Sequence, residues 1–235
     1  PGLEVEELLH VRAPFDHHIV AGDPEIGCPG CHVLGDIGRA GKKDLDMRVN
    51  LISNGTLIDP VSANNANPVA TGLGNMTVAG RSVTVGNGGT LVFNASDAMG
   101  SYQYKTPVTL IADCGTITNG SGRFMSIGDI ELKNGGTLNT VNGAASGYQA
   151  FNLRGTITVS GTSGSFITTT GTANNGIHLG GTTIPDTTFN VASTGDPTAD
   201  LIVSAPLRDE VYNTGGLIKT GAGKMVLTGL NTYTR

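Results

Sequence analysis

Gly135-Gly136-Thr137-Leu138 is the stretch that decides the fold, because closely related phrases recur along the chain. The others are Asn54-Gly55-Thr56-Leu57, Gly88-Gly89-Thr90-Leu91, Gly115-Thr116-Ile117, Gly155-Thr156-Ile157 and Gly180-Gly181-Thr182. From one phrase to the next, the glycine before threonine advances by 34, 26, 21, 19 and 26 residues. A period in the low twenties fits one coil of a parallel β-solenoid, in which each coil stacks on the preceding one.

Short strands are predicted around these phrases, because Val, Ile, Leu and Thr alternate there with other residues in period two. Gly, Asn or Asp closes each run, and Gly and Asn suit corners that need a positive φ. The sequence therefore predicts an all-β fold, a parallel β-helix (solenoid). An antiparallel sandwich is the rival, and the spacing of the phrases favours the solenoid. The predicted strands are 75–78, 82–85, 90–93, 108–111, 116–118, 130–132 and 156–159.

The chemistry of the chain changes near residue 48. Residues 1–48 hold 14 of the 33 charged residues, four of the five histidines and two of the three cysteines. We therefore divide the chain into an N-terminal segment, 1–48, and a β-solenoid domain, 49–235. Glycines and prolines predict a short, mostly irregular N-terminal segment. A unit of this size buries little apolar surface alone and usually needs a metal, cofactor, disulfide or partner.

Composition narrows the partners and the location. The net charge is −5 and no basic patch is visible, so nucleic acid is not an expected partner. No apolar run approaches the roughly 20 residues of a membrane-spanning helix, so no span is expected. The chain begins with Pro1 rather than Met, which fits a processed secretory N-terminus. We therefore expect a secreted, extracellular or cell-surface protein.

The C-terminal stretch GGLIKTGAGKMVLTGLNTYT (residues 215–234) resembles the autotransporter-associated β-strand repeat, also called the passenger-associated transport repeat. That family's pattern is Gly-Gly-Leu-x-Lys-Thr-Gly-x-Gly, then Leu-x-Leu-x-Gly, then Asn-Thr-Tyr-x-Gly. The resemblance covers about 20 residues and implies a right-handed parallel β-helix in a large secreted or surface-exposed bacterial protein. Arg235 stands where the family has glycine, and residues 1–48 do not match the family.

Cys28-Pro29-Gly30-Cys31-His32 is a complete Cys-x-x-Cys-His signature, the attachment motif of c-type haem. The thiols of Cys28 and Cys31 would form thioethers to the haem vinyl groups, and His32 would be the proximal iron ligand. His18 and His17 are the candidate distal ligands, with Met47 as a further possibility. Bis-histidine iron has no open coordination position, which suits electron transfer.

Two other interpretations of this motif stay open. Cys28, Cys31 and His32 with His17 or His18 could form a structural zinc site, or the two cysteines could form a disulfide or redox pair. The odd cysteine count argues against a disulfide framework. Cys114 stands alone, and we expect it to be buried and inert. His178 lies in a glycine-rich stretch and is expected to face solvent.

The sequence thus predicts an extracellular solenoid with one covalent haem c, acting in electron transfer with redox partners unspecified. It could form a homo-oligomer or filament through the solenoid ends. The alternative is a structural or adhesive surface or fibre protein whose Cys/His cluster is a zinc or disulfide staple. A polysaccharide-active enzyme is a remote third hypothesis, and no catalytic residue is expected. Asp129, Glu131 and Lys133 are predicted to be charged residues on the outside of a solenoid strand.

Overall fold

The computed structural model describes residues 49–59, 71–73, 76–99, 107–144, 147–181 and 185–235. Within these ranges the protein is all-β and has no helix. Its strands form three parallel sheets. Sheet 1 contains, in spatial order, β1 (Val49–Ser53), β3 (Ser82–Gly86), β5 (Thr109–Asp113), β8 (Ile130–Lys133), β11 (Ile157–Ser160), β14 (Asp186–Val191) and β17 (Gly216–Thr220).

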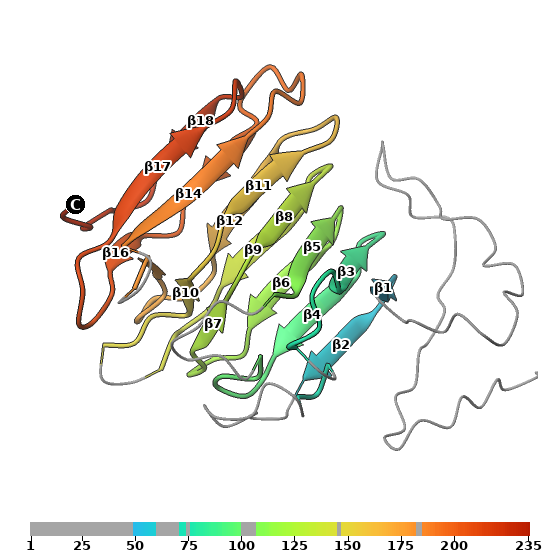
Figure 1. Cartoon of the computed structure of the whole chain (residues 1–235), viewed down its shortest axis with the longest axis horizontal. Helices are drawn as coiled ribbons and strands as arrows, with labels where there is room; N and C mark the ends of the chain where they lie inside the picture. Colours follow the sequence, from blue (N-terminus) through green and yellow to red (C-terminus); the bar gives the residue numbers. More distant parts are fainter. Residues whose placement is uncertain (1–48, 60–70, 74–75, 100–106, 145–146, 182–184) are drawn as a thin grey trace, which may run out of the picture.

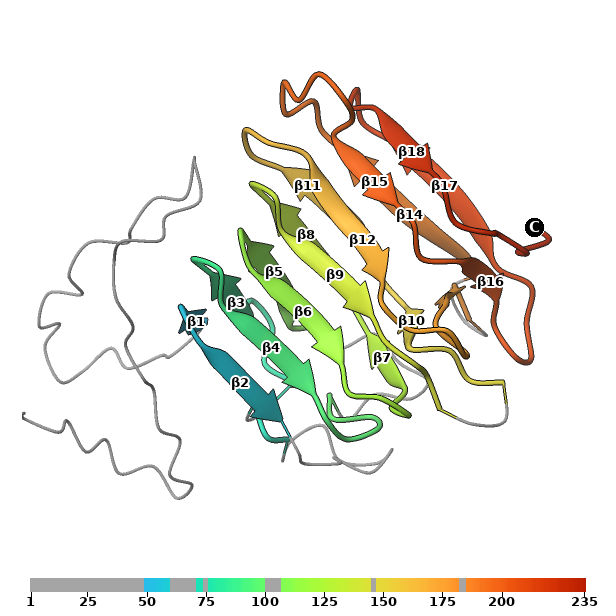
Figure 2. The same cartoon turned by 180° about the vertical axis from the view of Figure 1, so that it is seen from behind.

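Sheet 2 lies behind sheet 1 in Figure 1 and in front of it in Figure 2. It contains β2 (Thr56–Asp59), β4 (Thr90–Phe93), β6 (Thr116–Asn119), β9 (Thr137–Thr140), β12 (Ser165–Thr169), β15 (Leu201–Val203) and β18 (Met225–Leu227). Sheet 3 is shorter and contains β7 (Met125–Ile127), β10 (Phe151–Leu153), β13 (Ile177–Leu179) and β16 (Leu207–Asp209).

Each complete coil passes through sheets 1, 2 and 3 in turn, as β8, β9 and β10 do. Every strand pair is parallel, and each strand bonds to the equivalent strand one coil away. These stacked parallel sheets confirm the solenoid type of fold predicted from the repeated phrase. The antiparallel sandwich is excluded for the part of the chain that the structure describes.

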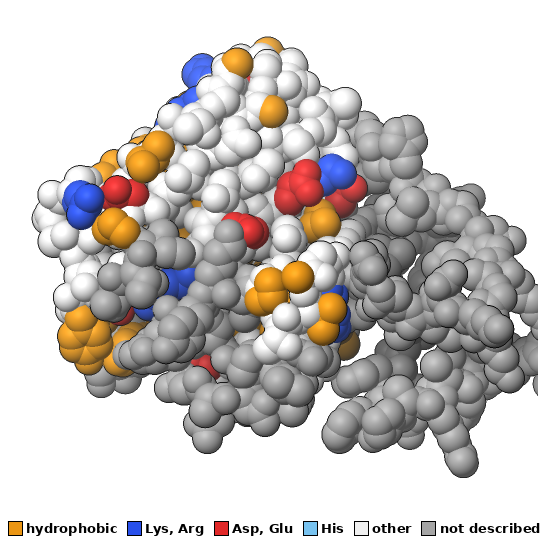
Figure 3. All heavy atoms as spheres, in the orientation of Figure 1, with side chains coloured by type: hydrophobic (Ala, Val, Ile, Leu, Met, Phe, Trp, Pro, Cys, Tyr) orange, Lys and Arg blue, Asp and Glu red, His pale blue; other side chains and the backbone are white. Residues whose placement is uncertain are grey.

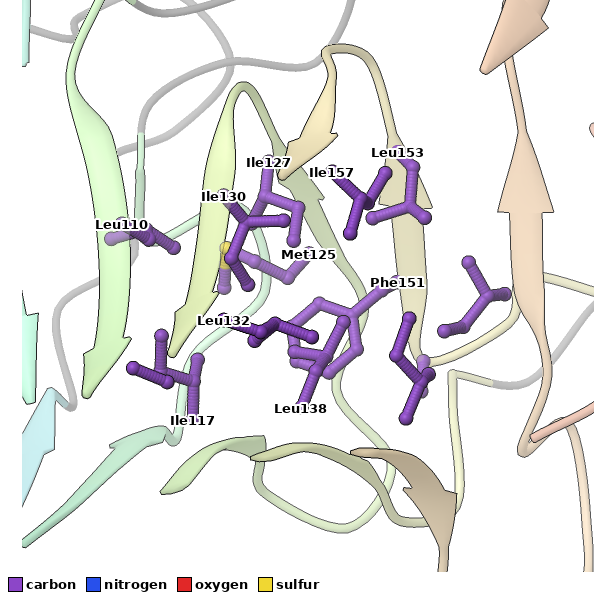
Figure 4. Packing of buried hydrophobic residues seen from close by; sticks show 14 of the residues in the cluster. Leu110, Ile117, Met125, Ile127, Ile130, Leu132, Leu138, Phe151, Leu153 and Ile157 are labelled. Carbon is purple, nitrogen blue, oxygen red and sulfur yellow. The ribbon is translucent and has the colours of Figure 1, made fainter. Parts of the chain in front are cut away.

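The core is a set of side-chain columns that run from coil to coil. One column in sheet 2 joins seven register-matched residues, because alternate strand residues point inward. Its five inner members are fully buried. Figure 4 shows Leu138 of this column beside Phe151 of sheet 3. The column is Leu57, Leu91, Ile117, Leu138, Ile167, Val203 and Leu227.

A left-handed corner joins sheet 1 to sheet 2 in the first four coils. Asn54, Asn87 and Asn134 occupy this corner with φ of 47°, 48° and 49°. Cys114 takes the same place in the third coil, with φ of 60°. Asparagine is enriched at positive φ, because its short polar side chain tolerates that backbone region. The corners confirm the role predicted for asparagine and show that one of them is a cysteine.

The repeated phrase marks the entry into sheet 2. Thr56, Thr90, Thr116 and Thr137 are register partners in successive coils, so the first four phrases are structurally equivalent. Gly155-Thr156-Ile157 is not equivalent, because it leads into β11 of sheet 1. Phe166 is the register partner of Thr137 in the fifth coil. The prediction that the 19 residues from Gly136 to Gly155 form one coil is therefore wrong.

The C-terminal repeat forms the last coil. Its first strand is β17, Gly221 makes the turn with φ of 74°, and β18 follows. The segment 231–234 then runs beside β16: Leu207 N donates to Asn231 Oδ1 (2.8 Å), and Thr232 N donates to Leu207 O (2.9 Å). The predicted strand at 75–78 is wrong where the structure describes it, because 76–77 form a turn, 78 belongs to no strand, and Met76 is buried.

Candidate functional site

The predicted haem ligands lie outside the described residues. This applies to Cys28, Cys31, His32, His18 and His17, and also to Met47. Within the part of the chain that the structure describes, no group of three or more His, Cys, Asp or Glu residues could hold a metal ion. The haem and zinc interpretations therefore remain predictions from the motif.

Cys114 is disulfide-bonded, and its partner lies outside the described residues. The expectation of an inert, isolated thiol is wrong. Cys114 follows β5 at a corner, where its backbone is held by both neighbouring coils. Its N–H donates to Lys133 O (3.0 Å), and its carbonyl accepts from Gly88 N (2.8 Å). The solenoid therefore holds a half-buried cysteine at a fixed place in its third coil.

This disulfide constrains the chemistry of the Cys-x-x-Cys-His motif. The chain has three cysteines, so an intrachain partner for Cys114 can only be Cys28 or Cys31. A haem attached through two thioethers uses both of those sulfurs. An intrachain Cys114 disulfide and a doubly attached haem therefore exclude each other in one molecule. Sequence reasoning did not predict this conflict, because an odd number of cysteines does not show which two of them form a disulfide.

A buried polar layer covers the outward face of sheet 3. Ser126, Asn152, His178 and Arg208 are the central residues of its four strands and are register partners in that order. Their strand neighbours, such as Phe151 and Leu179, point into the core. His178 is 2% exposed, so the expectation that it faces solvent is wrong. The alternation Ile177-His178-Leu179 was the sequence signal for a strand with an outward histidine.

His178 is held neutral by its surroundings. Burial lowers its pKa from 6.5 to about 4, Glu210 and Asp209 act in the opposite direction, and Arg154 and Arg208 lower it further. Arg154 and Glu210 form a buried ion pair, with Nη2 and Oε1 3.7 Å apart. Arg154 Nη1 also donates to Gly180 O (2.9 Å). Two basic and two acidic groups act on the imidazole, so the formal charges around it balance.

Three members of the polar layer carry atoms without hydrogen-bond partners. Both amide atoms of Asn152, Nδ1 of His178 and Nε of Arg208 are buried without a partner in the structure. Each such group costs about 1–3 kcal/mol relative to a bonded one. The imidazole has the neutral form that a proton acceptor needs, but Ser126, Asn152 and His178 are almost fully buried, and only Arg208 is half-buried.

The charged residues on and next to the outer face of β8 each have a hydrogen-bond or ion-pair partner in a neighbouring coil. Lys133 Nζ lies 3.8 Å from Asp113 Oδ2, and Ser160 Oγ donates to Glu131 Oε1 (2.7 Å). Asp129 Oδ1 accepts from Thr156 N (2.8 Å). Figure 3 shows acidic and basic side chains together on this side of the molecule. Glu131 and Lys133 lie on the outer face of β8, as predicted.

Asp97 is a separate buried carboxyl group in the loop after β4. Its backbone has a φ of 53°, and its Oδ1 has no hydrogen-bond partner in the structure. Burial raises its pKa from 3.8 to about 6.

The described residues contain no helix that is long and apolar enough to cross a membrane. Comparison with known proteins gives no further assignment: no protein family, curated protein or solved structure matches this chain.

Proposed function

We propose that this chain is a structural β-solenoid of an extracellular surface or fibre protein, whose N-terminal Cys/His segment is attached to the solenoid by a disulfide. The single observation that supports this is the disulfide at Cys114, at the corner of the third coil. A rigid stack of coils with a continuous apolar core is suited to act as a scaffold.

The location follows from the same bond. Disulfides persist in oxidising compartments such as the cell surface, and they are rare in the cytosol. The resemblance of residues 215–234 to the passenger-associated repeat supports the same location and a right-handed coil. We therefore propose a secreted or surface-exposed bacterial protein.

A second candidate function is electron transfer through one haem c, and the Cys28-Pro29-Gly30-Cys31-His32 signature favours it. In that case Cys28 and Cys31 hold the haem, His32 is the proximal ligand, and His18 or His17 is the distal ligand. Bound haem would supply one-electron chemistry. This candidate requires Cys114 to be reduced or bonded to another molecule.

The experiment is to express the chain in a host that exports it and attaches haem. Visible spectra are recorded for the oxidised and reduced protein, and a denaturing gel is stained for haem. The thiols are then alkylated without reductant, and the peptides are mapped by mass spectrometry. A colourless protein with a Cys114 cross-link to Cys28 or Cys31 supports the scaffold. A haem stain that survives denaturation, with Cys114 alkylated, overturns it in favour of the cytochrome.

Cys114→Asn is the matched variant, because asparagine occupies the same corner in the coils on either side. If the scaffold proposal holds, this variant has two alkylated thiols in the motif and stays colourless. If disulfide formation only competes with haem attachment, the variant becomes haem-stained where the native chain is not. That second outcome would favour electron transfer as the function of this chain.

A further inference from the structure

The outward face of sheet 2 is uncharged over its five inner strands, each of which has a bonded neighbour on both sides. In β4, β6, β9, β12 and β15, core residues alternate with residues that face outward. Five of the nine outward residues are threonines, none of the nine is ionisable, and all except Thr118 are at least partly exposed. These nine residues, which we call the threonine face, are Thr90, Val92, Thr116, Thr118, Thr137, Asn139, Phe166, Thr168 and Ile202.

The outward face of sheet 1 differs, because it carries charges in the same coils. Asp113 is an outward residue of β5, and Glu131 and Lys133 are outward residues of β8. Charged side chains are the residues that most often stay on a protein surface, so their absence from one of two large faces is informative. Partners in a complex have complementary potentials, and a charged group that loses its water without a counter-charge is unfavourable. The threonine face therefore fits a partner without charge.

Three threonines form a row across the threonine face. Thr90, Thr116 and Thr137 are register partners in successive strands, so their hydroxyl and methyl groups repeat at the strand spacing of about 4.8 Å. Figure 2 shows β4, β6 and β9 side by side on this face. Threonine is branched at Cβ and has few χ1 choices on a strand, so these groups keep their positions before any partner binds.

A second row, two residues further along the strands, is fixed by hydrogen bonds between coils. Thr168 Oγ1 donates to Asn139 Oδ1 (3.0 Å), and Asn139 Nδ2 donates to Thr118 Oγ1 (3.2 Å). Two residues of a strand rise by about 6.6 Å, which is the distance between the two rows. The two rows thus form a rigid rectangular array of polar and methyl groups on one face of the sheet.

Ice is the uncharged partner that this array fits best. The prism faces of ice present water oxygens in a rectangular array whose repeats are close to the two spacings of the threonine face. Ice excludes ions, so a face without charge is required, whereas threonine hydroxyls can take the place of lattice waters and methyl groups can lie between them. A rigid face also loses little conformational freedom on binding. A glycan would favour several aromatic platforms, and Phe166 is the single aromatic residue of this face.

We propose that the threonine face of sheet 2 binds ice, with the row of Thr90, Thr116 and Thr137 at the centre of the contact. On a protein exposed at the cell surface, such a face would hold the cell to ice or stop small crystals from growing. The proposal goes beyond the scaffold function, and it depends on neither the disulfide at Cys114 nor a haem. Colour and thiol mapping test those features separately.

The experiment measures ice binding by the purified full chain in two ways. Nanolitre osmometry records the gap between the melting and the freezing temperature of a single ice crystal, and slow growth of ice from solution shows whether the protein enters the ice or stays in the liquid. The native chain should open a temperature gap and enter the ice, unlike an unrelated globular protein at the same molar concentration. Thr116→Lys should lose both properties, because it places a hydrated charge between Thr90 and Thr137.

Thr158→Lys is the matched control. Thr158 is a half-buried outward residue of the inner strand β11 in sheet 1, so the same substitution is made in the same kind of position on the other face. This variant should bind ice like the native chain, and thermal melts establish that both variants fold. A native chain that opens no gap and is excluded from ice overturns the proposal, as does an equal loss in both lysine variants. A chain that is excluded from ice but retained on a column of neutral glucan also overturns it, in favour of a glycan ligand.

Discussion

Cys114 has the positive φ that asparagine has at the equivalent corners of neighbouring coils, and it also forms a disulfide. Replacing it with asparagine keeps a residue that suits a φ of 60° and removes the disulfide. We expect Cys114→Asn to lower the free energy of unfolding by about 2–4 kcal/mol, because the disulfide constrains the unfolded chain. Urea titrations with and without reductant measure this: reductant should destabilise the native chain and leave the variant unchanged.

Cys114→Val is the control for the corner itself. A β-branched residue at positive φ is strained, so this variant should be less stable than Cys114→Asn by about 1–3 kcal/mol. If Cys114→Asn is as stable as the oxidised native chain, the disulfide contributes nothing to the solenoid.

His178 makes stability depend on pH in a window that its pKa defines. The folded pKa of about 4 lies below the ordinary value of 6.5, so the imidazole is neutral in both states above pH 6.5. As pH falls from 6.5 toward 4, the unfolded chain binds a proton that the folded chain excludes. The free energy of unfolding should therefore decrease across this window, by up to about 3 kcal/mol.

The measurement compares urea unfolding of the native chain and His178→Gln between pH 7.5 and 4.5, with the difference between the two slopes as the readout. Asp97 has a raised pKa of about 6, so it stabilises the fold as pH falls through the same window and masks part of the native slope. The variant keeps Asp97, so the subtraction isolates His178. Equal slopes would show that the His178 imidazole binds a proton as readily in the folded protein as in the unfolded chain.

His178 and Cys114 also show what the sequence alone could not predict about single residues. Alternation in Ile177-His178-Leu179 predicts a strand, but only the structure shows that the outward face of that strand is buried. Cys114 resembles a strand residue because the third coil replaces the corner asparagine. Its role at the corner is visible only when the coils are aligned. Its disulfide depends on a partner that is distant in the sequence.

At the scale of the strand, the glycine of the repeated phrase is explained by close approach between coils. A Cβ on Gly136 would lie 1.9 Å from Ala112 O, and one on Gly115 would lie 2.3 Å from Val85 O. Gly136→Ala should therefore push neighbouring coils apart and destabilise the protein by about 1–3 kcal/mol. Gly55 lies in the first coil, and its nearest contact would be Ser53 O at 3.8 Å.

Gly55→Ala is thus the matched variant, with the same phrase and no coil beneath it among the described residues. It should change stability by no more than about 0.5 kcal/mol. Thermal melts of both variants test the pair. Equal destabilisation would mean that the glycine is needed for its local conformation and not for the approach of a neighbouring coil.

The same contacts explain how far the sequence predicted the elements. Strands 90–93, 116–118 and 130–132 were predicted to within about one residue, because each combines alternation with a phrase or a closing glycine. The phrase did not predict the coil spacing correctly at Gly155. A Cβ there would lie 2.5 Å from Gly128 C, which is a contact between neighbouring coils at a different corner. A glycine before threonine indicates that two neighbouring coils approach each other closely, and such an approach can occur at any corner of the solenoid.

At the scale of the molecule, each coil contacts only its neighbours, so its stability depends on its position in the stack. An inner strand such as β8 is bonded on both sides, by β5 and β11, whereas β18 is bonded on one side by β15. Repeat proteins open from such ends, and amide exchange follows the free energy of local opening. We expect exchange to be slowest in β8, β9 and β11 and fastest in β17 and β18.

Hydrogen-exchange mass spectrometry of the native chain tests this gradient. In dilute protein the outer coil should exchange first, while the inner coils remain protected. Equal exchange in all coils would show that the solenoid opens as one cooperative unit, which would mean that the interfaces between neighbouring coils are strong enough to couple the whole core column from Leu57 to Leu227.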